Sequence, residues 1–423
     1  MNQPSNSPHQ YPPPPYDEEE PTAYRLRPRD IIVGAQMLFV AFGALVLVPI
    51  LTGLNPNVAL FTAGVGTLAF QLVTGGKVPV FLASSFAFIT PITFGVQEFG
   101  LPATLSGLVG AGVLYLVLSL VIFWRGPDIV LRVLPPIVTG PVIMVIGLSL
   151  APIAVQMASE PGDFYSAAAA KGVAAAALVV TMLTALLARG MLRLIPILIG
   201  IIVGYLVALP LGMVDFSPLG GAPWFAFPQF ITPEFNLGAI AFILPVAIAP
   251  AIEHIGDILA ISSVTDRPFI HDPGLHRTLL GDGLATSIAA FLGGPPNTTY
   301  SEVTGAVALT RAFNPGIMTW AAIASVVLSF IGKIGAVLQT IPPPVMGGVL
   351  MVLFGTIVVV GMNSLVHSGD NLMEQRNLII VGVILILGVG GMALEAGRFA
   401  LEGIGLCSVV GVILNLLLPV GAE

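Results

Sequence analysis

Charged residues are scarce in this sequence. Only 9% of the 423 residues are Asp, Glu, Lys or Arg, whereas 56% are hydrophobic, and the mean hydropathy is +0.98. Because about a quarter of the residues of a soluble domain are charged, this composition excludes an ordinary soluble fold. Apolar runs of about 18 residues or more, which is long enough to cross a bilayer, recur along most of the chain. The sequence therefore predicts an all-α polytopic membrane protein.

Cysteine and enzyme signatures are also nearly absent. The single Cys407 excludes a disulfide framework and a cysteine-based metal site, so a small buried filler is its expected role. No HExxH or GxSxG motif appears. The glycine run at 107–113 does not follow a strand, so it indicates close helix packing rather than a nucleotide-binding loop. We therefore predict neither an enzyme nor a nucleic-acid partner, and no metal site.

The first 29 residues are polar and rich in proline, and no cleavable signal peptide precedes the first apolar run. They include QYPPPPYDEEEP, which would suit a groove that binds polyproline helices. We prefer a disordered cytoplasmic tail over residues 1–29, because this composition buries too little apolar surface to fold.

Fourteen candidate membrane spans follow this tail. They cover residues 30–51, 57–74, 78–95, 103–124, 135–156, 166–188, 191–213, 236–262, 278–293, 296–311, 315–339, 344–363, 376–394 and 399–419. If the N-terminus is cytoplasmic, twelve of the fifteen Lys and Arg residues face the cytoplasm, and only Lys171, Lys333 and Arg398 do not. This is the bias of the positive-inside rule, and it predicts a cell-membrane protein with both termini cytoplasmic.

An internal repeat divides the chain. Residues 135–147 read PPIVTGPVIMVIG and residues 343–355 read PPVMGGVLMVLFG, 208 residues later. Both copies begin with a proline pair suited to a helix start. Seven spans per half is an odd number, so the second copy enters the membrane from the opposite side. Such inverted repeats are typical of secondary transporters, which place the substrate site near the midplane between the halves.

The third and tenth spans carry the polar residues that a broken span would need. KVPVFLASSFAFITP and PPNTTYSEVTGAVALT each begin near proline and hold hydroxyl and aromatic residues at mid-depth. We expect short extended pieces that lead into half-helices and that pair with each other, since extended backbone at this depth needs partners. Phe86 and Ser301 are best placed to present free backbone N–H groups to a shared cavity.

A second polar cluster lies in LPVAIAPAIEHIGDILA, residues 244–260. Its two prolines predict a kink just before Glu253. Glu253 and Asp257 share a helix face, and His254 points about 100° away. His254 could instead cap a carbonyl or pack between helices, and Asp257 could be a structural hydrogen-bonding residue. For Glu253 and Glu302 a structural role is the weaker interpretation, because neither polar segment contains a Lys or Arg to pair with them.

At these clusters the sequence resembles the nucleobase–ascorbate transporter (nucleobase:cation symporter-2) family, and its bacterial uracil:proton symporters most closely. The resemblance begins near residue 30 and covers nearly all of the remaining chain. It includes LASSFAFITP (82–91), EHIG (253–256), DPGLHR (272–277), PNTTY (296–300) and PPPVMGG (342–348). The resemblance implies fourteen segments as a 7+7 inverted repeat, in which segments 3 and 10 form a short antiparallel strand pair. It also implies a core domain (30–124 and 236–339) and a gate domain (135–213 and 344–419), and it leaves open a homodimer through the gate domain.

By this resemblance, Glu253 and Glu302 hold the base, the backbone amides of Phe86 and Ser301 meet its carbonyls, and Glu302 is linked to proton coupling. Phe86 and Tyr300 would line an apolar slot for the planar ring. We expect a proton-coupled importer of a nucleobase, preferably uracil, with alternating access between core and gate. Glu302, Asp257 and His254 are the candidate proton carriers, and no cofactor is expected besides the coupling proton.

The sequence departs from the uracil symporters at a few positions. Val303 replaces an Asn that usually follows the Glu, and Asp257, Phe354 and Met37 stand where His, Tyr and His are common. These departures bear chiefly on the proton route, because two titratable or hydroxyl partners are lost and an acid is gained. They bear less directly on the substrate, for which a xanthine or urate transporter of the same family is the alternative to uracil. An anion exchanger of the same fold and a membrane-embedded enzyme are weaker alternatives. The first would place a cation or bare helix N-termini at the site, and the second would need acidic clusters with metal-ligand spacing.

Overall fold

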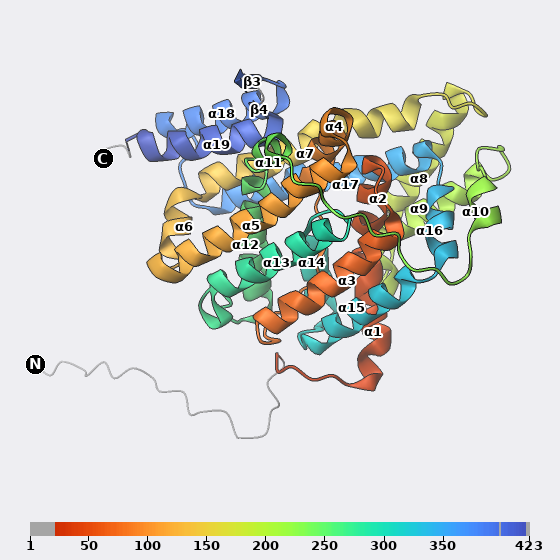
Figure 1. Ribbon diagram of the computed structural model, residues 1–423, viewed down its shortest axis with the longest axis horizontal. Helices are drawn as coiled ribbons and strands as arrows, with labels where there is room; N and C mark the ends of the chain where they lie inside the picture. The colour runs from red at the N-terminus through yellow and green to blue at the C-terminus, as the bar shows by residue number, and fades with distance from the viewer. Residues whose placement is uncertain (1–21, 397–398, 420–423) are drawn as a thin grey trace, which may run out of the picture.

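The computed structural model describes residues 22–396 and 399–419, and nearly all of its regular elements are helices (Figure 1). The helices before residue 230 are α1 (Ile31–Val40), α2 (Phe42–Thr52), α3 (Pro56–Val73), α4 (Ile89–Phe99), α5 (Leu101–Arg125), α6 (Asp128–Val133), α7 (Pro136–Ser159), α8 (Ala167–Leu187), α9 (Pro196–Ala208) and α10 (Ser217–Gly221). The later helices are α11 (Leu237–Ile243), α12 (Ile248–Thr265), α13 (Leu275–Phe291), α14 (Ser301–Thr310), α15 (Gly316–Ser329), α16 (Gly332–Gln339), α17 (Pro343–His367), α18 (Gln375–Val389) and α19 (Gly403–Leu417).

Two pairs of short strands complete the regular structure. The strands are β1 (Ala83–Ser84), β2 (Asn297–Thr298), β3 (Ala393–Ala396) and β4 (Phe399–Glu402). β1 pairs with β2, and β3 pairs antiparallel with β4. Single helical turns join other elements, namely η1 (Pro28–Asp30), η2 (Phe86–Phe88), η3 (Gly190–Leu194) and η4 (Ile270–Gly274). The prediction of a mainly helical chain is confirmed.

The helices have the length and apolarity of membrane spans. Within the described residues six helical stretches can cross a membrane by length and composition, and the bent pair α11–α12 makes a seventh. α9, α15, α18 and α19 are apolar but shorter. Every predicted span contains helix, yet several are broken or short, so the count of fourteen crossings stays a prediction.

The helices pack in two groups. In the first, α13 lies between α5 and α3, and α3 continues to α15 and α1 (Figure 1). In the second, α17 packs along α7 and also contacts α8 and α9, while α18 joins α7 to α19. Fewer contacts connect the groups, chiefly from α12 to α7 and α19 and from α2 to α9. The first group contains segments expected in the core domain, and the second contains segments expected in the gate.

The two copies of the sequence repeat are α7 and α17, and they lie against each other. Each begins with proline in its first turn, as predicted. A Cβ at Gly140 would meet the backbone of Gly361, and one at Gly147 would meet that of Phe354, so the two helices run antiparallel and touch through their backbones. Repeat glycines at this contact therefore allow close helix approach.

Gly147→Ala is expected to destabilise the protein. The added Cβ would lie 2.5 Å from the carbonyl oxygen of Phe354, so α7 and α17 must separate, at a cost of about 1–3 kcal/mol. Gly355→Ala is the matched control, because nothing lies within 4 Å of a Cβ there. Thermal unfolding of the purified variants in detergent should show a lower Tm for Gly147→Ala alone. An equal Tm for both variants would contradict this packing.

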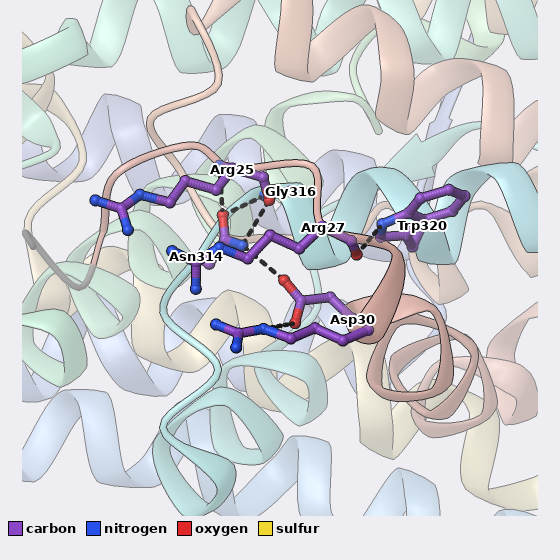
Figure 2. A network of polar contacts seen from close by, with 7 residues as sticks. Arg25, Arg27, Asp30, Asn314, Gly316 and Trp320 are labelled. Carbon is purple, nitrogen blue, oxygen red and sulfur yellow. Dashed lines mark hydrogen bonds and ion pairs between the residues drawn. The ribbon is translucent and has the colours of Figure 1, made fainter.

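Residues 22–29 are fixed to the helical body. Asn314 accepts a hydrogen bond from the backbone N–H of Arg25 (2.9 Å) and donates to the Arg25 carbonyl (2.7 Å), while the Trp320 indole donates to the Arg27 carbonyl (3.0 Å; Figure 2). The prediction that a disordered tail extends to residue 29 is therefore wrong for residues 22–29. The rest of that tail, including the PPPPY stretch, lies outside the described residues.

Candidate functional site

Two broken segments meet through their strands. β1 and β2 pair antiparallel, with Ala83 opposite Thr298 and Ser84 opposite Asn297, and all four residues are buried. Each strand leads into a half-helix: β1 continues into η2 and α4, and β2 into α14. The predicted pairing of the third and tenth segments is thus present, and it brings together positions more than 200 residues apart.

Neighbouring helices satisfy the extended backbone of this strand pair. The Thr286 hydroxyl donates to the Asn297 backbone carbonyl at 2.7 Å, and the Asn297 side-chain amide donates in turn to the Thr62 backbone carbonyl at 2.9 Å. The backbone N–H of Leu82 donates to the Thr67 hydroxyl at 2.9 Å. Extended backbone at membrane depth is tolerated only with such partners. Hydrogen bonds from polar groups of α3 and α13 therefore fix the position of the strand pair.

The half-helices begin at the two residues expected to present backbone amides. Phe86 opens η2 and Ser301 opens α14, and among the described residues no side chain caps either start. The hydroxyl of Tyr300 donates to the Ser84 carbonyl, and that of Ser301 donates to Asp257 Oδ1 at 2.5 Å. Because both hydroxyls are engaged, Ser301 has its backbone N–H and Tyr300 its ring to offer a ligand.

α11 and α12 bend by 44° at the break over residues 244–247, which contains Pro245. The predicted kink is therefore confirmed, about one and a half turns before Glu253. Pro250 lies in the first turn of α12, where a missing N–H costs little. The break starts a new helix whose second turn carries Glu253, and α12 packs against α14.

Glu253 and Glu302 lie on facing half-helices. Both side chains are half-buried, whereas their neighbours are mostly buried. Since α12 packs against α14, the two acidic side chains belong to neighbouring helices. In the part of the chain that the structure describes, neither forms an ion pair with Lys, Arg or His. Glu302 also lies in the first turn of α14, where the helix dipole favours a negative charge.

Behind these carboxylates lies a chain of buried polar groups. Thr299 donates to Asp257 Oδ2 at 2.9 Å and lies 3.4 Å from His254 Nδ1, which is 3.7 Å from Asp282 Oδ1. His254 and Asp282 are fully buried, and neither oxygen of Asp282 has a hydrogen-bond partner among the described residues. Asp257 thus joins the start of α14 to α12, and His254 faces a second acid rather than solvent.

Sequence reasoning missed Asp282. It sits in the middle of α13, inside the predicted ninth span. An acid inside the membrane is costly, and this argument, which singled out Glu253, applies equally to Asp282.

The described residues contain no cluster of three or more His, Cys, Asp or Glu side chains able to hold a metal ion.

Three aromatic rings line one side of the site. Phe86 contacts Tyr300 at 6.1 Å between ring centroids and Phe354 at 6.0 Å, both edge to face. Phe354 belongs to α17, so Phe86 joins the two packing groups. The resemblance expects polar residues at positions 303 and 37. Val303 and Met37 are fully buried there, and neither supplies a polar group to the site.

A cavity of about 290 Å³ lies between the packing groups. Its lining includes Thr90 and Pro91 of α4, Val246 in the α11–α12 break, and Ser149 of α7. Glu253 and Glu302 do not line it; Thr90 comes four residues after Phe86, and Val246 comes seven residues before Glu253, in the α11–α12 break. The cavity therefore shares the broken segments of the predicted site but is lined by none of the predicted site residues.

Several known proteins are similar to this chain in sequence or in fold. A family model for xanthine/uracil permeases, described as Permease family, matches residues 29–397. The chain is 56% identical over 391 residues to a probable uracil permease of Pasteurella multocida, covering 92% of this chain and 94% of that protein. It is 46% identical over 396 residues to the uracil permease of Bacillus caldolyticus, covering 92% of each. The transmembrane domain of a cyanobacterial bicarbonate transporter, BicA, has the same fold, with a TM-score of 0.61, 13% identity, and coverage of 93% of this chain and 99% of that one. The chain therefore belongs to the xanthine/uracil permease family of integral membrane transporters, which are not enzymes.

Proposed function

We propose that this protein is a proton-coupled symporter that imports uracil. The observation that carries the proposal is the meeting of two carboxylates, Glu253 and Glu302, with two uncapped half-helix starts beside Phe86 and Tyr300. Relatives at 46–56% identity that are named uracil permeases support uracil as the substrate.

The chemistry of uracil fits these groups. Its ring presents two N–H donors and two C=O acceptors, so binding requires acceptors and donors side by side. Glu253 and Glu302 supply the acceptors for the ring N–H groups. The backbone N–H groups of Phe86 and Ser301 supply donors for the carbonyls, and the rings of Phe86 and Tyr300 bound an apolar slot for the flat base.

Glu302 carries the coupling proton in this proposal, and no cofactor is needed. Glu302 and Glu253 lie on two packed helices, and in the described residues neither has a Lys, Arg or His partner, so a proton is the counter-charge that Glu302 can take up. Asp257 links the Ser301 hydroxyl to Thr299 and His254, which gives a bound proton a path of polar groups. His254 lies 3.7 Å from Asp282 Oδ1, so Asp282 is the last polar group of this path.

Alternating access would come from motion between a core and a gate domain, within fourteen segments arranged as a 7+7 inverted repeat. The two packing groups of helices and the antiparallel contact of α7 with α17 support this division. Phe86 touches Phe354 across it, so the substrate slot borders the moving boundary. The Lys and Arg distribution supports cytoplasmic termini. A homodimer through the gate domain rests on the family resemblance alone.

A competition panel tests the substrate. Uptake of radiolabelled uracil by cells that express the protein would be measured with unlabelled uracil, thymine, xanthine, urate and ascorbate in excess. We expect uracil to compete fully and xanthine, urate and ascorbate to have little effect. Stronger competition by xanthine or urate than by uracil would assign the protein to the purine transporters of the family.

A further inference from the structure

A mostly apolar groove of about 740 Å³ lies between the two packing groups, away from the proposed substrate site. Its walls are α9, the junction of α1 and α2, and α15–α16, with Ile202 and Leu206 of α9 on one side and Val337 of α16 on the other. These three side chains are exposed by 43–57%, so the groove opens laterally on the surface. Its volume lies within the range of about 300–1,000 Å³ typical of ligand sites.

The groove offers few polar groups to bind a nucleobase, and no carboxylate lines it. The Tyr205 hydroxyl on its wall is already hydrogen-bonded to Thr340 at 2.7 Å. The remaining lining is aliphatic or aromatic, apart from the ammonium of Lys333. A long hydrocarbon chain therefore fits this lining better than any polar metabolite does.

Lys333 gives the groove one charged end. Its ammonium donates to the Leu219 carbonyl at 2.6 Å, which uses one of three N–H donors. In the described residues it forms no ion pair. Asp215, the acid nearest to Leu219 in sequence, instead accepts hydrogen bonds from Ser217 at 2.9 and 2.6 Å, which lower the pKa of Asp215. The ammonium is thus available to an anion.

The expected position of Lys333 in the membrane also favours an anionic ligand. It is one of the three cations that the predicted spans and orientation place on the side opposite the cytoplasm, where Lys and Arg are few. Trp224, also on the lining, is 78% exposed, and exposed tryptophans favour the membrane–water interface. An apolar groove that opens sideways, with a cation and an indole at its end, matches a phospholipid with its head group at the interface.

We propose that this groove binds one anionic phospholipid, with an acyl chain between α9 and α16 and the phosphate on Lys333. A lipid in this position spans the boundary between the packing groups, so its binding stabilises the arrangement in which the groove is open. The proposal does not depend on which base is transported.

Lys333→Gln tests the head-group contact. Purified protein in mild detergent would be titrated with phosphatidylglycerol or phosphatidylcholine of identical acyl chains, with bound lipid counted by native mass spectrometry and Tm measured in parallel. We expect the wild type to prefer phosphatidylglycerol and Lys333→Gln to lose about fivefold of that preference, since one cation at a membrane surface contributes about that factor. Lys171→Gln is the control, because Lys171 is another non-cytoplasmic cation, on α8, that does not line the groove.

Ile202→Trp tests the acyl-chain position separately. The indole fills the groove from α9, so both lipids should bind less while the preference for phosphatidylglycerol is reduced only in Lys333→Gln. Equal binding of the two lipids to the wild type, or an unchanged preference in Lys333→Gln, would overturn the proposal. Unchanged lipid counts in a folded Ile202→Trp variant would overturn the groove as the seat of the chain.

Discussion

Glu302→Gln is expected to abolish proton-driven accumulation of uracil while leaving exchange of the base across the membrane. Gln keeps the size of Glu302 and an oxygen that accepts a hydrogen bond, but it cannot take up and release a proton. In proteoliposomes one pH unit more alkaline inside, a symporter that carries one proton accumulates its substrate at most about tenfold. The variant should reach only the outside concentration, as measured with radiolabelled uracil.

Glu98→Gln is the matched control for this result, because Glu98 lies exposed near the end of α4, on the half-helix that follows Phe86. It should accumulate uracil as the wild type does. Uphill uptake by Glu302→Gln with an unchanged dependence on pH would remove Glu302 as the proton carrier, although Glu302 could still bind the base.

Glu253→Ala is expected to weaken uracil binding by about 10–150-fold, since a hydrogen bond to a charged group contributes about 1.5–3 kcal/mol. Glu253→Gln should fall between this variant and the wild type, because the amide oxygen still accepts a neutral hydrogen bond. Binding of radiolabelled uracil to the purified protein gives the dissociation constants.

Thermal unfolding of the same samples separates lost binding from lost structure. Within the described residues Glu253 forms no ion pair, so its removal breaks no such contact and Tm should stay near that of the wild type. A folded Glu253→Ala protein that binds uracil as tightly as the wild type would show that the base lies elsewhere.

The local breaks in the chain could be predicted from the sequence because single residues cause them. Pro245 marks the α11–α12 bend, and the proline pairs mark the starts of α7 and α17. The pairing of β1 with β2 was also within reach, since extended backbone inside a membrane needs a partner and only two segments had the composition for it.

The contacts behind the site were not predictable in the same way. That Asp257 accepts from Thr299 and Ser301, and that His254 faces Asp282, depends on how α12, α13 and β2 pack. A hydropathy average over a span changes little with one acidic residue, so the predicted span 278–293 gave no sign of Asp282. The order of residues 22–29 was missed for a related reason, because its partner Asn314 is nearly 300 residues away.

The most direct test of the central claim is uracil uptake into proteoliposomes that contain the purified wild-type protein, with and without an imposed pH gradient. If the protein couples uracil to protons, uracil should accumulate above its outside concentration when the interior is alkaline, and a protonophore should release the excess. Uptake that reaches the same level with and without the gradient would contradict the account.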